Sequence, residues 1–567
     1  MLFAVRDFKG AIPRLHPKLL PENFAQIARN TRLEDGALGP VRQTTNVHTF
    51  GSNVLSIYLD GSTWRGWATE VDVATAPIAD DRIYYTGSGA PKMMVAGVEY
   101  ALALPAPVSA PTVANLATPN QSLLETVYYA YTWVTGFGEE SPPSPLSAAL
   151  DTSADVTVRV NAFAAAPAGR NITAKRIYRS QTTASGVTEL FFVAEIAAAT
   201  TSYDHSLATA PLQEVIPSTD YDPPPAGLLG LTAMPNGMMA AFDGKEVYFS
   251  EPYQPHAWPI KYTLTVDHAI VGLAAFGSSL AILTSANPYI AQGTHPESMA
   301  MEKMDKSLPC LSRRGIVDVG YGALYPSGEG LAMISGQNAE IMSRNLFTRE
   351  QWRALSPETF VAGHFDGRYA FTFTYTNFDF YDCGDASGFG AFLFDGGAAP
   401  ASSLLGAAIF DFGSAISAFG DQRLGFIDIS GQAPFFIDTD IVVPSAMHVD
   451  VSSGEFYMLE NGTDVIRWED PAAAFATQRW RSKTIVFPTP VNFGAFMVQT
   501  QGVVQGGNVF SAMVFADGAL VETITSTNTP ERLPGGFRAT QWEVEIVSDT
   551  TVTGFALASS VHELLQL

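Results

Sequence analysis

The sequence contains little cysteine and little positive charge. Its 567 residues include two cysteines, Cys310 and Cys383, which are too few for a disulfide framework in a chain of this length. We therefore predict that both are buried, reduced thiols. Lys and Arg number 32 against 56 Asp and Glu, which gives a formal net charge of −24. This sign argues against a protein that grips nucleic acid by counterion release, although nucleic acid could still slide past such a chain.

A long apolar segment is also missing. The longest apolar stretches, such as 228–242, are broken by proline and glycine and fall short of the roughly 20 residues that a bilayer-spanning helix requires. Arg6, Asp7 and Lys9 interrupt what would be the apolar core of a signal peptide. Charged residues make up 16% of the chain and hydrophobic residues 47%, which excludes a disordered protein. We expect a folded protein with no membrane span, made in the cytoplasm.

The signature motifs of catalysis are absent as well. The sequence has no Walker loop, no GxSxG, no HExxH and no CxxC, and its nine histidines are scattered without metal-ligand spacing. Three carboxylate pairs stand out: Glu139 and Glu140, Asp80 and Asp81, and Asp438 and Asp440. Such pairs could supply the acid and nucleophile of a glycosidase, but adjacent residues on a strand point to opposite faces, which argues against the first two pairs. Asp438 and Asp440 share a face, but we expect them to lie in a loop. We interpret all three as solvated surface, and predict no enzyme, no cofactor and no metal.

The local patterns that are present indicate β-structure almost throughout. Asp-Gly or Asn-Gly dipeptides, which favour tight hairpin turns, begin at positions 35, 60, 236, 243, 366, 395, 461 and 517. Hairpin-like units recur around 240–252, 276–292, 321–343, 365–375, 391–397, 420–438 and 452–468, with a similar unit in 52–97. Helical periodicity is confined to two short candidates, 21–30 and 348–355. The sequence predicts an all-β protein.

Changes in composition divide the chain into four parts. Residues 1–104 form an N-terminal segment with the first propeller strands, and residues 105–225 form a proline-bounded insertion with several short alternating strands. This insertion fits an immunoglobulin-like or fibronectin-like β-sandwich. The irregularly spaced hairpins of 226–470 favour the remainder of a β-propeller-like core, and 471–567 a small C-terminal β-domain. Two packed sheets in place of the propeller remain an alternative.

Three methionines form the one candidate contact site. Met299, Met301 and Met304 lie in 295–306, a segment that is otherwise polar and that we expect to be a loop. Flexible thioether side chains suit adaptable contact surfaces, so we predict that these residues contact a partner or a gate. The alternative interpretation is ordinary packing beneath the loop.

Four segments resemble one family of viral proteins. The segment 19–42 resembles the opening of tail proteins in short-tailed bacteriophages, 480–495 and 556–564 look like the closing domain of the same family, and 234–259 looks like its propeller. The positions that fill the opening pattern are Pro21, Ala25, Ala28, Asn30, Leu33, Gly36, Leu38 and Pro40. The family is the tail nozzle, also called tail tubular protein B or packaged-DNA stabilisation protein.

The resemblance implies a structural virion protein of the tail, assembled in the cytoplasm of a bacterial host. It implies a homohexameric ring that contacts a portal-adaptor protein and tail fibres or spikes, and through which double-stranded DNA passes without sequence-specific binding. DNA would be retained by this nozzle and ejected through it, with no catalytic residue involved. Two other functions stay open at this point, a tail-associated propeller glycan hydrolase or depolymerase and a glycan-binding adhesin.

Overall fold

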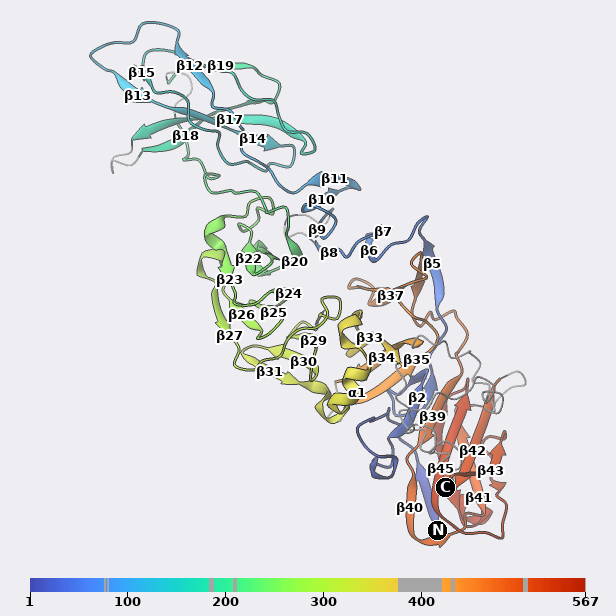
Figure 1. The fold of residues 1–567 in the computed structure, drawn as a ribbon. Coiled ribbons are helices and arrows are strands. Elements are labelled where there is room, and N and C mark those ends of the chain that lie inside the picture. The colour runs from blue at the N-terminus through green and yellow to red at the C-terminus, as the bar shows by residue number, and fades with distance from the viewer. Residues whose placement is uncertain are drawn as a thin grey trace, which may run out of the picture. The chain divides into compact units, whose positions relative to one another are not determined.

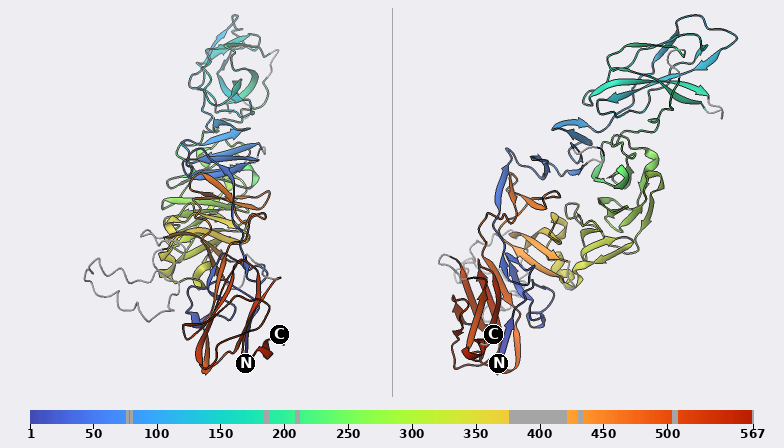
Figure 2. Two further views of the ribbon diagram at one scale, coloured as in Figure 1. Left: turned by 90° about the vertical axis from the view of Figure 1, so that its right-hand side faces the viewer. Right: turned by 180° about the vertical axis from the view of Figure 1, so that it is seen from behind.

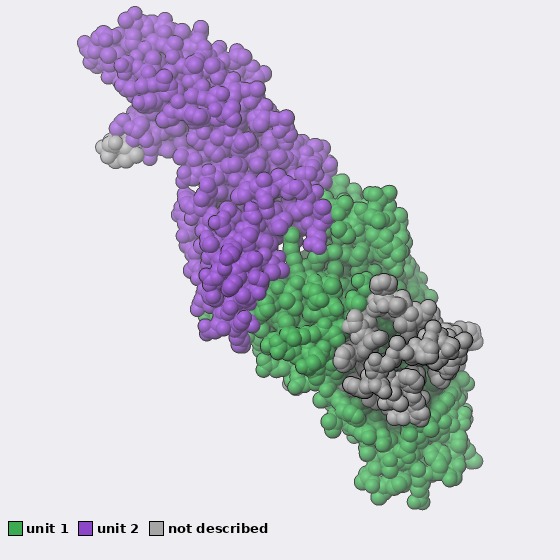
Figure 3. Space-filling model, in the orientation of Figure 1, with its two compact units in different colours: residues 1–68, 308–567 green, residues 69–307 purple. Residues whose placement is uncertain are grey.

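The structure is a computed structural model that describes residues 1–75, 78, 81–182, 188–207, 212–375, 421–429, 434–502 and 508–565. The chain divides into two compact units, shown in different colours in Figure 3. Unit 1 consists of residues 1–68 and 308–567, and unit 2 of residues 69–307. Within the described residues the chain forms 46 strands and two short α-helices. The all-β prediction is therefore confirmed.

Unit 2 contains three four-stranded antiparallel sheets that follow one another in the sequence (Figure 1). Their strands are β8 (Asp72–Thr75), β9 (Arg82–Thr86), β10 (Lys92–Val95) and β11 (Val98–Ala101); β20 (Leu229–Ala233), β21 (Met239–Asp243), β22 (Glu246–Phe249) and β23 (Leu264–Thr265); and β24 (Ile270–Phe276), β25 (Ser279–Thr284), β26 (Tyr289–Gln292) and β27 (Ala300–Lys303). The first strand of the middle sheet, β20, contacts the first strands of both others. Propeller blades meet in this way.

Unit 1 repeats the pattern with three more groups of four paired strands, the second of which is one end of a ten-stranded sheet, and with a hairpin. The strands are β28 (Val317–Asp318), β29 (Ala323–Ser327), β30 (Gly330–Ser335) and β31 (Asn338–Ile341); β32 (Ala362–Phe365), β33 (Arg368–Tyr375), β34 (Asp421–Asp428) and β35 (Phe435–Thr439); β36 (Ala446–Asp450), β37 (Glu455–Glu460), β38 (Asp464–Arg467) and β5 (Thr45–Thr49); and the hairpin β6 (Ser56–Asp60) and β7 (Thr63–Trp67). Successive first strands again contact one another. The N-terminal strand β5 completes the sheet of β36, so distant parts of the chain share one blade.

Local turn signals account for these hairpins. At Asp366-Gly367 and Asn461-Gly462 both residues have positive φ, between 50° and 73°, which is the conformation of a type I′ turn. Six of the seven predicted hairpins of 226–470 coincide with strand pairs of these sheets, and the seventh, 391–397, lies outside the described residues. The β-propeller-like core is therefore present, as a set of blade sheets in each unit.

The insertion is a β-sandwich within unit 2. Its strands are β12 (Thr112–Asn115), β13 (Glu125–Val127), β14 (Tyr129–Thr135), β15 (Leu150–Thr152), β16 (Val158–Asn161), β17 (Ile172–Thr182), β18 (Thr188–Ala197) and β19 (Ser202–His205). Strands β12, β16 and β19 form one sheet, β14, β17 and β18 a second, and β13 pairs with β15. Tyr129, Val160 and Ile177 are buried between them. The predicted sandwich is thus confirmed.

A serine-proline segment covers the edge of β14. The backbone N–H of each of three serines donates to a carbonyl of β14, and the Oγ of that serine accepts the N–H of the same β14 residue, at 2.9–3.2 Å. The pairs are Ser141 with Trp133, Ser144 with Tyr131 and Ser147 with Tyr129. Because proline has no backbone N–H, the hydrogen bonds to this edge come from the serines, two from each. Residues 141–147 read Ser-Pro-Pro-Ser-Pro-Leu-Ser, so a serine recurs at every third position. This repeat therefore protects a strand edge that would otherwise be open.

Both ends of the chain enter one β-domain of unit 1, and Figure 2 shows the two termini close together. The strands of this domain are β1 (Leu2–Val5), β2 (Ala25–Arg29), β39 (Gln478–Ser482), β40 (Ile485–Val491), β41 (Ala495–Thr500), β42 (Phe510–Ala516), β43 (Ala519–Ile524), β44 (Glu531–Arg532), β45 (Ala539–Ser548) and β46 (Val552–Ala558). Strand β1 pairs with β46, and β2 lies between β35 and β39. The C-terminal β-domain therefore includes N-terminal strands.

The two helix predictions have opposite outcomes. The helix predicted in 348–355 is confirmed as α1 (Arg349–Ala354), where Thr348 and Gln351 form a reciprocal capping box and Trp352 faces the core. The helix predicted in 21–30 is wrong, because residues 25–29 form the strand β2. The backbone groups of β2 form hydrogen bonds with β35 on one side and β39 on the other, so they do not need the internal hydrogen bonds of a helix. The other short helix, α2 (Val561–Leu564), lies at the C-terminus.

Candidate functional site

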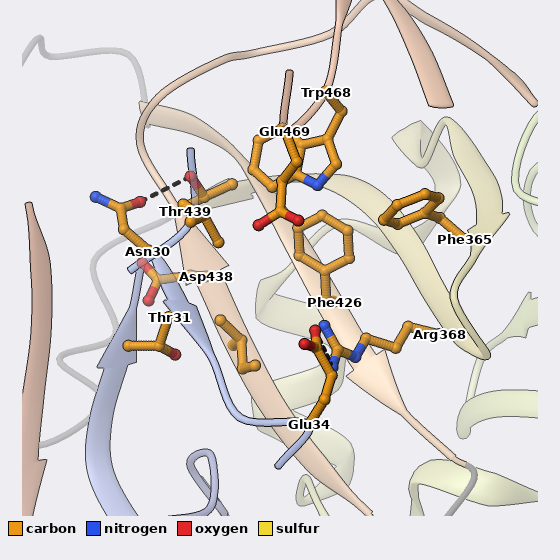
Figure 4. A pocket seen from close by; sticks show the side chains of 12 residues that line it. Asn30, Thr31, Glu34, Phe365, Arg368, Phe426, Asp438, Thr439, Trp468 and Glu469 are labelled. Atoms are coloured by element: carbon orange, nitrogen blue, oxygen red, sulfur yellow. Dashed lines mark hydrogen bonds and ion pairs between the residues drawn. The ribbon is translucent and has the colours of Figure 1, made fainter. Parts of the chain in front are cut away.

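One pocket of unit 1 lies where the N-terminal segment meets the β32–β35 sheet (Figure 4). Its lining residues are Asn30, Thr31, Glu34, Val41, Phe365, Arg368, Phe426, Ile437, Asp438, Thr439, Trp468 and Glu469. The space available to the centres of water-sized molecules is about 20 Å³. A single water needs roughly 10–15 Å³ by the same measure, so the pocket has room for about one water and none for a sugar ring.

The charges of this pocket neutralise one another. Figure 4 shows Glu34 and Arg368 pointing toward each other, and Arg368 donates to Glu34 Oε1 at 3.1 Å. Arg32 pairs with Glu34 at 3.0 Å and approaches Glu469 at 3.7 Å. Burial raises the pKa of Glu469 above its ordinary value. With acidic and basic groups interleaved, the pocket offers no excess charge that would hold an anionic or cationic substrate.

Asn30 fixes the N-terminal segment at the rim of the pocket. Its φ of 53° is left-handed, a conformation that asparagine tolerates better than other non-glycine residues. Its Nδ2 donates to Asp440 Oδ1 at 2.8 Å and to the Thr477 carbonyl at 3.0 Å. Its Oδ1 accepts from Thr439 Oγ1 at 2.7 Å and from the Asp440 N–H at 3.3 Å. One side chain thus joins β2, β35 and the start of β39.

Replacing Asn30 with alanine should therefore lower the free energy of unfolding of unit 1 by about 2–3 kcal/mol, since it removes buried hydrogen bonds and leaves a left-handed alanine. Asn30→Gly should recover about 1 kcal/mol of that loss, because glycine adopts the same φ freely. Asn46→Ala, at an exposed asparagine with one side-chain bond, is the matched control. Denaturant unfolding, monitored by hydrogen exchange, measures the free energy of unfolding of all three variants. Equal losses of stability at positions 30 and 46 would contradict this role.

Three members of the carboxylate pairs, Glu139, Glu140 and Asp438, are not the solvated surface that the sequence predicted, whereas Asp81 and Asp440 are exposed. Asp438 is 9% exposed, and Glu139 and Glu140 are each 4% exposed. Asp438 accepts from Arg29 Nε at 2.8 Å and from Arg423 Nη1 at 3.1 Å. Arg423 lies on the neighbouring strand of the same hairpin, but Arg29 lies 409 residues away in the sequence, and local patterns do not reveal such a partner.

The neighbours Glu139 and Glu140 bind different partners. Glu139 pairs with Arg170, and Glu140 pairs with Arg176 and Tyr178, so the two point in different directions as expected for neighbours on an extended chain. Asp80 lies outside the described residues, and Asp81 is exposed. Every buried carboxylate of these pairs is thus bound to arginine, an arrangement typical of structural ion pairs.

The methionine segment is more ordered than the sequence suggested. Residues 296–298 form a 3-10 turn and 300–303 form β27, the outer strand of its sheet. Met299 and Met304 are each 8% exposed, and Met299 packs into the core of the blade sheets. Met301 is half-buried against the same core. Ordinary packing accounts for Met299 and Met304, and a partner or gate contact stays a prediction that Met301 alone is placed to make.

The described residues show no metal-binding cluster and a protected thiol. No group of three or more His, Cys, Asp or Glu side chains within them is arranged to hold a metal ion. Cys310 is a free, buried cysteine, and burial raises the pKa of its thiol to about 12, so it stays protonated and unreactive. Cys383 lies outside the described residues. No helix in the part of the chain that the structure describes is long and apolar enough to cross a membrane.

A histidine that sequence inspection passed over fixes the β6–β7 hairpin. His448 on β36 accepts the Leu59 N–H through Nε2 at 3.4 Å, and its ring meets Tyr58 and Trp64 edge-on at 5.1 and 5.9 Å. Burial lowers the pKa of His448 to about 4, with Asp450 opposing the shift. No local pattern signals this burial, because the same-face neighbours of His448 on β36 are Ala446 and Asp450, and the rings that cover it come from β6 and β7.

The stability of unit 1 should therefore fall in mild acid. His448 binds a proton near pH 6.5 in the unfolded chain but only near pH 4 in the folded chain. The contribution of the neutral histidine to the free energy of unfolding is therefore fully present above pH 6.5 and is lost as the pH falls toward 4. The loss should be on the order of 2 kcal/mol at pH 4.5. His448→Gln should flatten this part of the pH profile, while the exposed His268→Gln should leave it unchanged. Denaturant unfolding at several pH values checks the profile, and equal slopes in all three proteins would refute the assignment.

Comparison with known proteins finds no matching family and no similar curated sequence. Two solved structures share a distant likeness. The N-terminal domain of Nup159 is 7% identical, with a TM-score of 0.23, over 65% of this chain and 86% of that chain. A structure of S. cerevisiae Dbp5 bound to Nup159, Gle1, IP6 and ADP is 10% identical, with a TM-score of 0.21, over 59% of this chain and 93% of that chain. Likenesses this weak carry no argument, and the propeller-like character rests on the sheets described above.

Proposed function

We propose that this chain is a structural virion protein, the tail nozzle of a short-tailed bacteriophage, through which DNA is retained and then ejected. The observation that carries the proposal is the resemblance of segments 19–42, 234–259, 480–495 and 556–564 to that family. The positions that carry it have architectural roles here. Gly36, for example, has a φ of 82°, and a side chain there would meet Asp7 at 2.8 Å.

The chemistry of the described residues supports a structural role. The buried carboxylates are neutralised by arginine, and the pocket near Asn30 has room for one water. A glycan hydrolase needs two carboxylates facing a substrate-sized cleft, which this pocket does not provide. The net charge of −24 also suits a conduit, because a tube wall of the same sign as phosphate repels DNA and lets it pass.

The assembly follows from the same proposal. Copies of this chain form a ring, expected to be a hexamer, beneath the portal and its adaptor protein and in contact with the tail fibres or spikes. Assembly takes place in the bacterial cytoplasm, where a chain with two cysteines needs no disulfide. The sandwich decorates the ring, and Met301 is the candidate contact of the methionine segment.

Immunogold labelling of purified, DNase-treated particles tests the location of the protein. An antibody raised against the chain should place gold at the tail tip, below the portal vertex. Particles that carry no gold, with the protein free in the lysate, would overturn the proposal. Cleavage of host polysaccharide by the purified chain would then favour a depolymerase, and glycan-array binding without cleavage an adhesin.

A further inference from the structure

Three ionisable side chains are buried where the sandwich meets the blade sheets of unit 2. Glu139 follows β14, and Arg170 precedes β17, so both belong to the sandwich. His256 follows β22 and belongs to a blade sheet. Their exposed fractions are 4%, 1% and 0%. Charged groups are almost never buried to this extent unless they are paired. The contact between the sandwich and the blade sheets, which we call the joint, therefore depends on the ion pair and hydrogen bonds of these three side chains.

The ion pair of this cluster ties the sandwich to the sheet of β8–β11. Arg170 Nη2 donates to Glu139 Oε2 at 2.7 Å, and Arg170 Nη1 contacts the Met93 sulfur at 3.7 Å. Phe137 lies in the loop between β14 and Glu139, and its ring packs edge-on against Tyr100, with the ring centres 5.2 Å apart. The loop after β14 is thus inserted against the blade sheet and keeps water away from the ion pair.

His256 completes the cluster from the blade side. Its Nε2 lies 2.9 Å from the backbone carbonyl oxygen of Glu140, which can only accept, so Nε2 carries the proton and Nδ1 a lone pair. Within the described residues Nδ1 has no hydrogen-bond partner, and it lies 3.9 Å from Glu139 Oε1, which also has none there; this distance is too long for a hydrogen bond. The groups that face this ring are Glu139, Glu140 and Arg170 from the sandwich, and Tyr221, whose ring lies edge-on at 5.9 Å.

A proton on Nδ1 is unfavourable while the joint is closed. It would place a second cation beside Arg170 in a buried site, and Glu139 is already bound to that arginine through its other oxygen. Burial and Arg170 lower the pKa of His256, while Glu139 and Glu140 oppose the shift, and burial outweighs them. The closed joint therefore contains a neutral imidazole near pH 7.

We propose that His256 makes the joint between the sandwich and the blade sheets acid-sensitive, with the joint closed while the imidazole is neutral and opening when it binds a proton. In the open joint the ring is in water, where histidine protonates near pH 6.5. Proton binding therefore draws the equilibrium toward the open state, by up to about tenfold for each pH unit below 6.5. This inference does not depend on the proposed role in a phage tail.

Hydrogen exchange of the full chain, measured by mass spectrometry at pH 7.5 and pH 5.5 with times scaled to the intrinsic exchange rates, tests the proposal. Peptides covering 135–140 and 253–258 should exchange about tenfold faster at pH 5.5, because their protection reports the open population. Peptides from β17, in the middle of the sandwich, should keep their protection. His256→Gln keeps an N–H that can donate to the Glu140 carbonyl but does not titrate, so its joint should be equally protected at both pH values.

His268→Gln is the matched control, since His268 is exposed in the same unit, and it should behave like the wild type. The proposal is wrong if the wild-type joint keeps its protection at pH 5.5, or if His256→Gln loses as much protection as the wild type. Should His256→Gln fail to fold, the wild-type profile from pH 7.5 to 5.0 decides alone. Constant protection of 135–140 and 253–258 over that range would overturn the proposal.

Discussion

Replacing Arg170 with methionine should destabilise unit 2 by about 3–5 kcal/mol. The substitution keeps an unbranched chain of similar length but leaves the carboxylate of Glu139 buried without a cation, and the cost of an unpaired buried charge exceeds that of a lost surface bridge. Hydrogen exchange should show the loss in peptides of both the sandwich and the β8–β11 sheet, because Arg170 contacts Met93 there.

Arg159→Met provides the control for this prediction. Arg159 and Asp204 form a two-bond ion pair in the same sandwich at 2.7 and 2.8 Å, yet both side chains are more than 40% exposed. Solvent screens an exposed pair, so this variant should lose far less stability than Arg170→Met. The double variant Glu139→Gln/Arg170→Met should recover part of the stability that Arg170→Met alone loses. Similar losses at positions 159 and 170 would show that burial of the pair has no energetic consequence.

Short-range signals explain what could be predicted from the sequence. The turn at Asp366-Gly367 requires residues that accept positive φ, and the helix α1 begins at a capping box formed by residues three apart. Both depend on residues close together in the chain, so the hairpins, the all-β class and this helix follow from the sequence alone.

Long-range partners explain what could not be predicted. Strand β2 is held by β35 and β39, which lie more than 400 residues away in the sequence, so its local helical pattern was misleading. Glu139 and Asp438 read as surface residues because acidic side chains usually are, and only their arginine partners make burial possible. The same holds for Met299, whose neighbours in the polar segment give no sign of the core beneath it.

Trp480→Ala is expected to cost about 3–5 kcal/mol in unit 1, the range for removing a buried tryptophan. Trp480 on β39 is fully buried, and its indole N–H donates to the Lys9 carbonyl at 3.1 Å. Its ring meets Phe8 edge-on at 5.0 Å and packs against Phe555 at 6.1 Å. One side chain therefore bridges the N-terminal segment and two strands of the C-terminal domain.

The location of the effect distinguishes this prediction from general destabilisation. Hydrogen exchange should rise in 1–12 as well as in β39 and β46, because Trp480 holds the N-terminal segment onto them, while unit 2 should keep its protection. Trp64→Ala removes a half-buried tryptophan from the β6–β7 hairpin and should cost about 1–2 kcal/mol without affecting 1–12. If Trp480→Ala leaves 1–12 protected, backbone pairing of β1 with β46 and of Ala11 with Phe436 is enough to hold the N-terminal segment, and the indole contributes only to local packing.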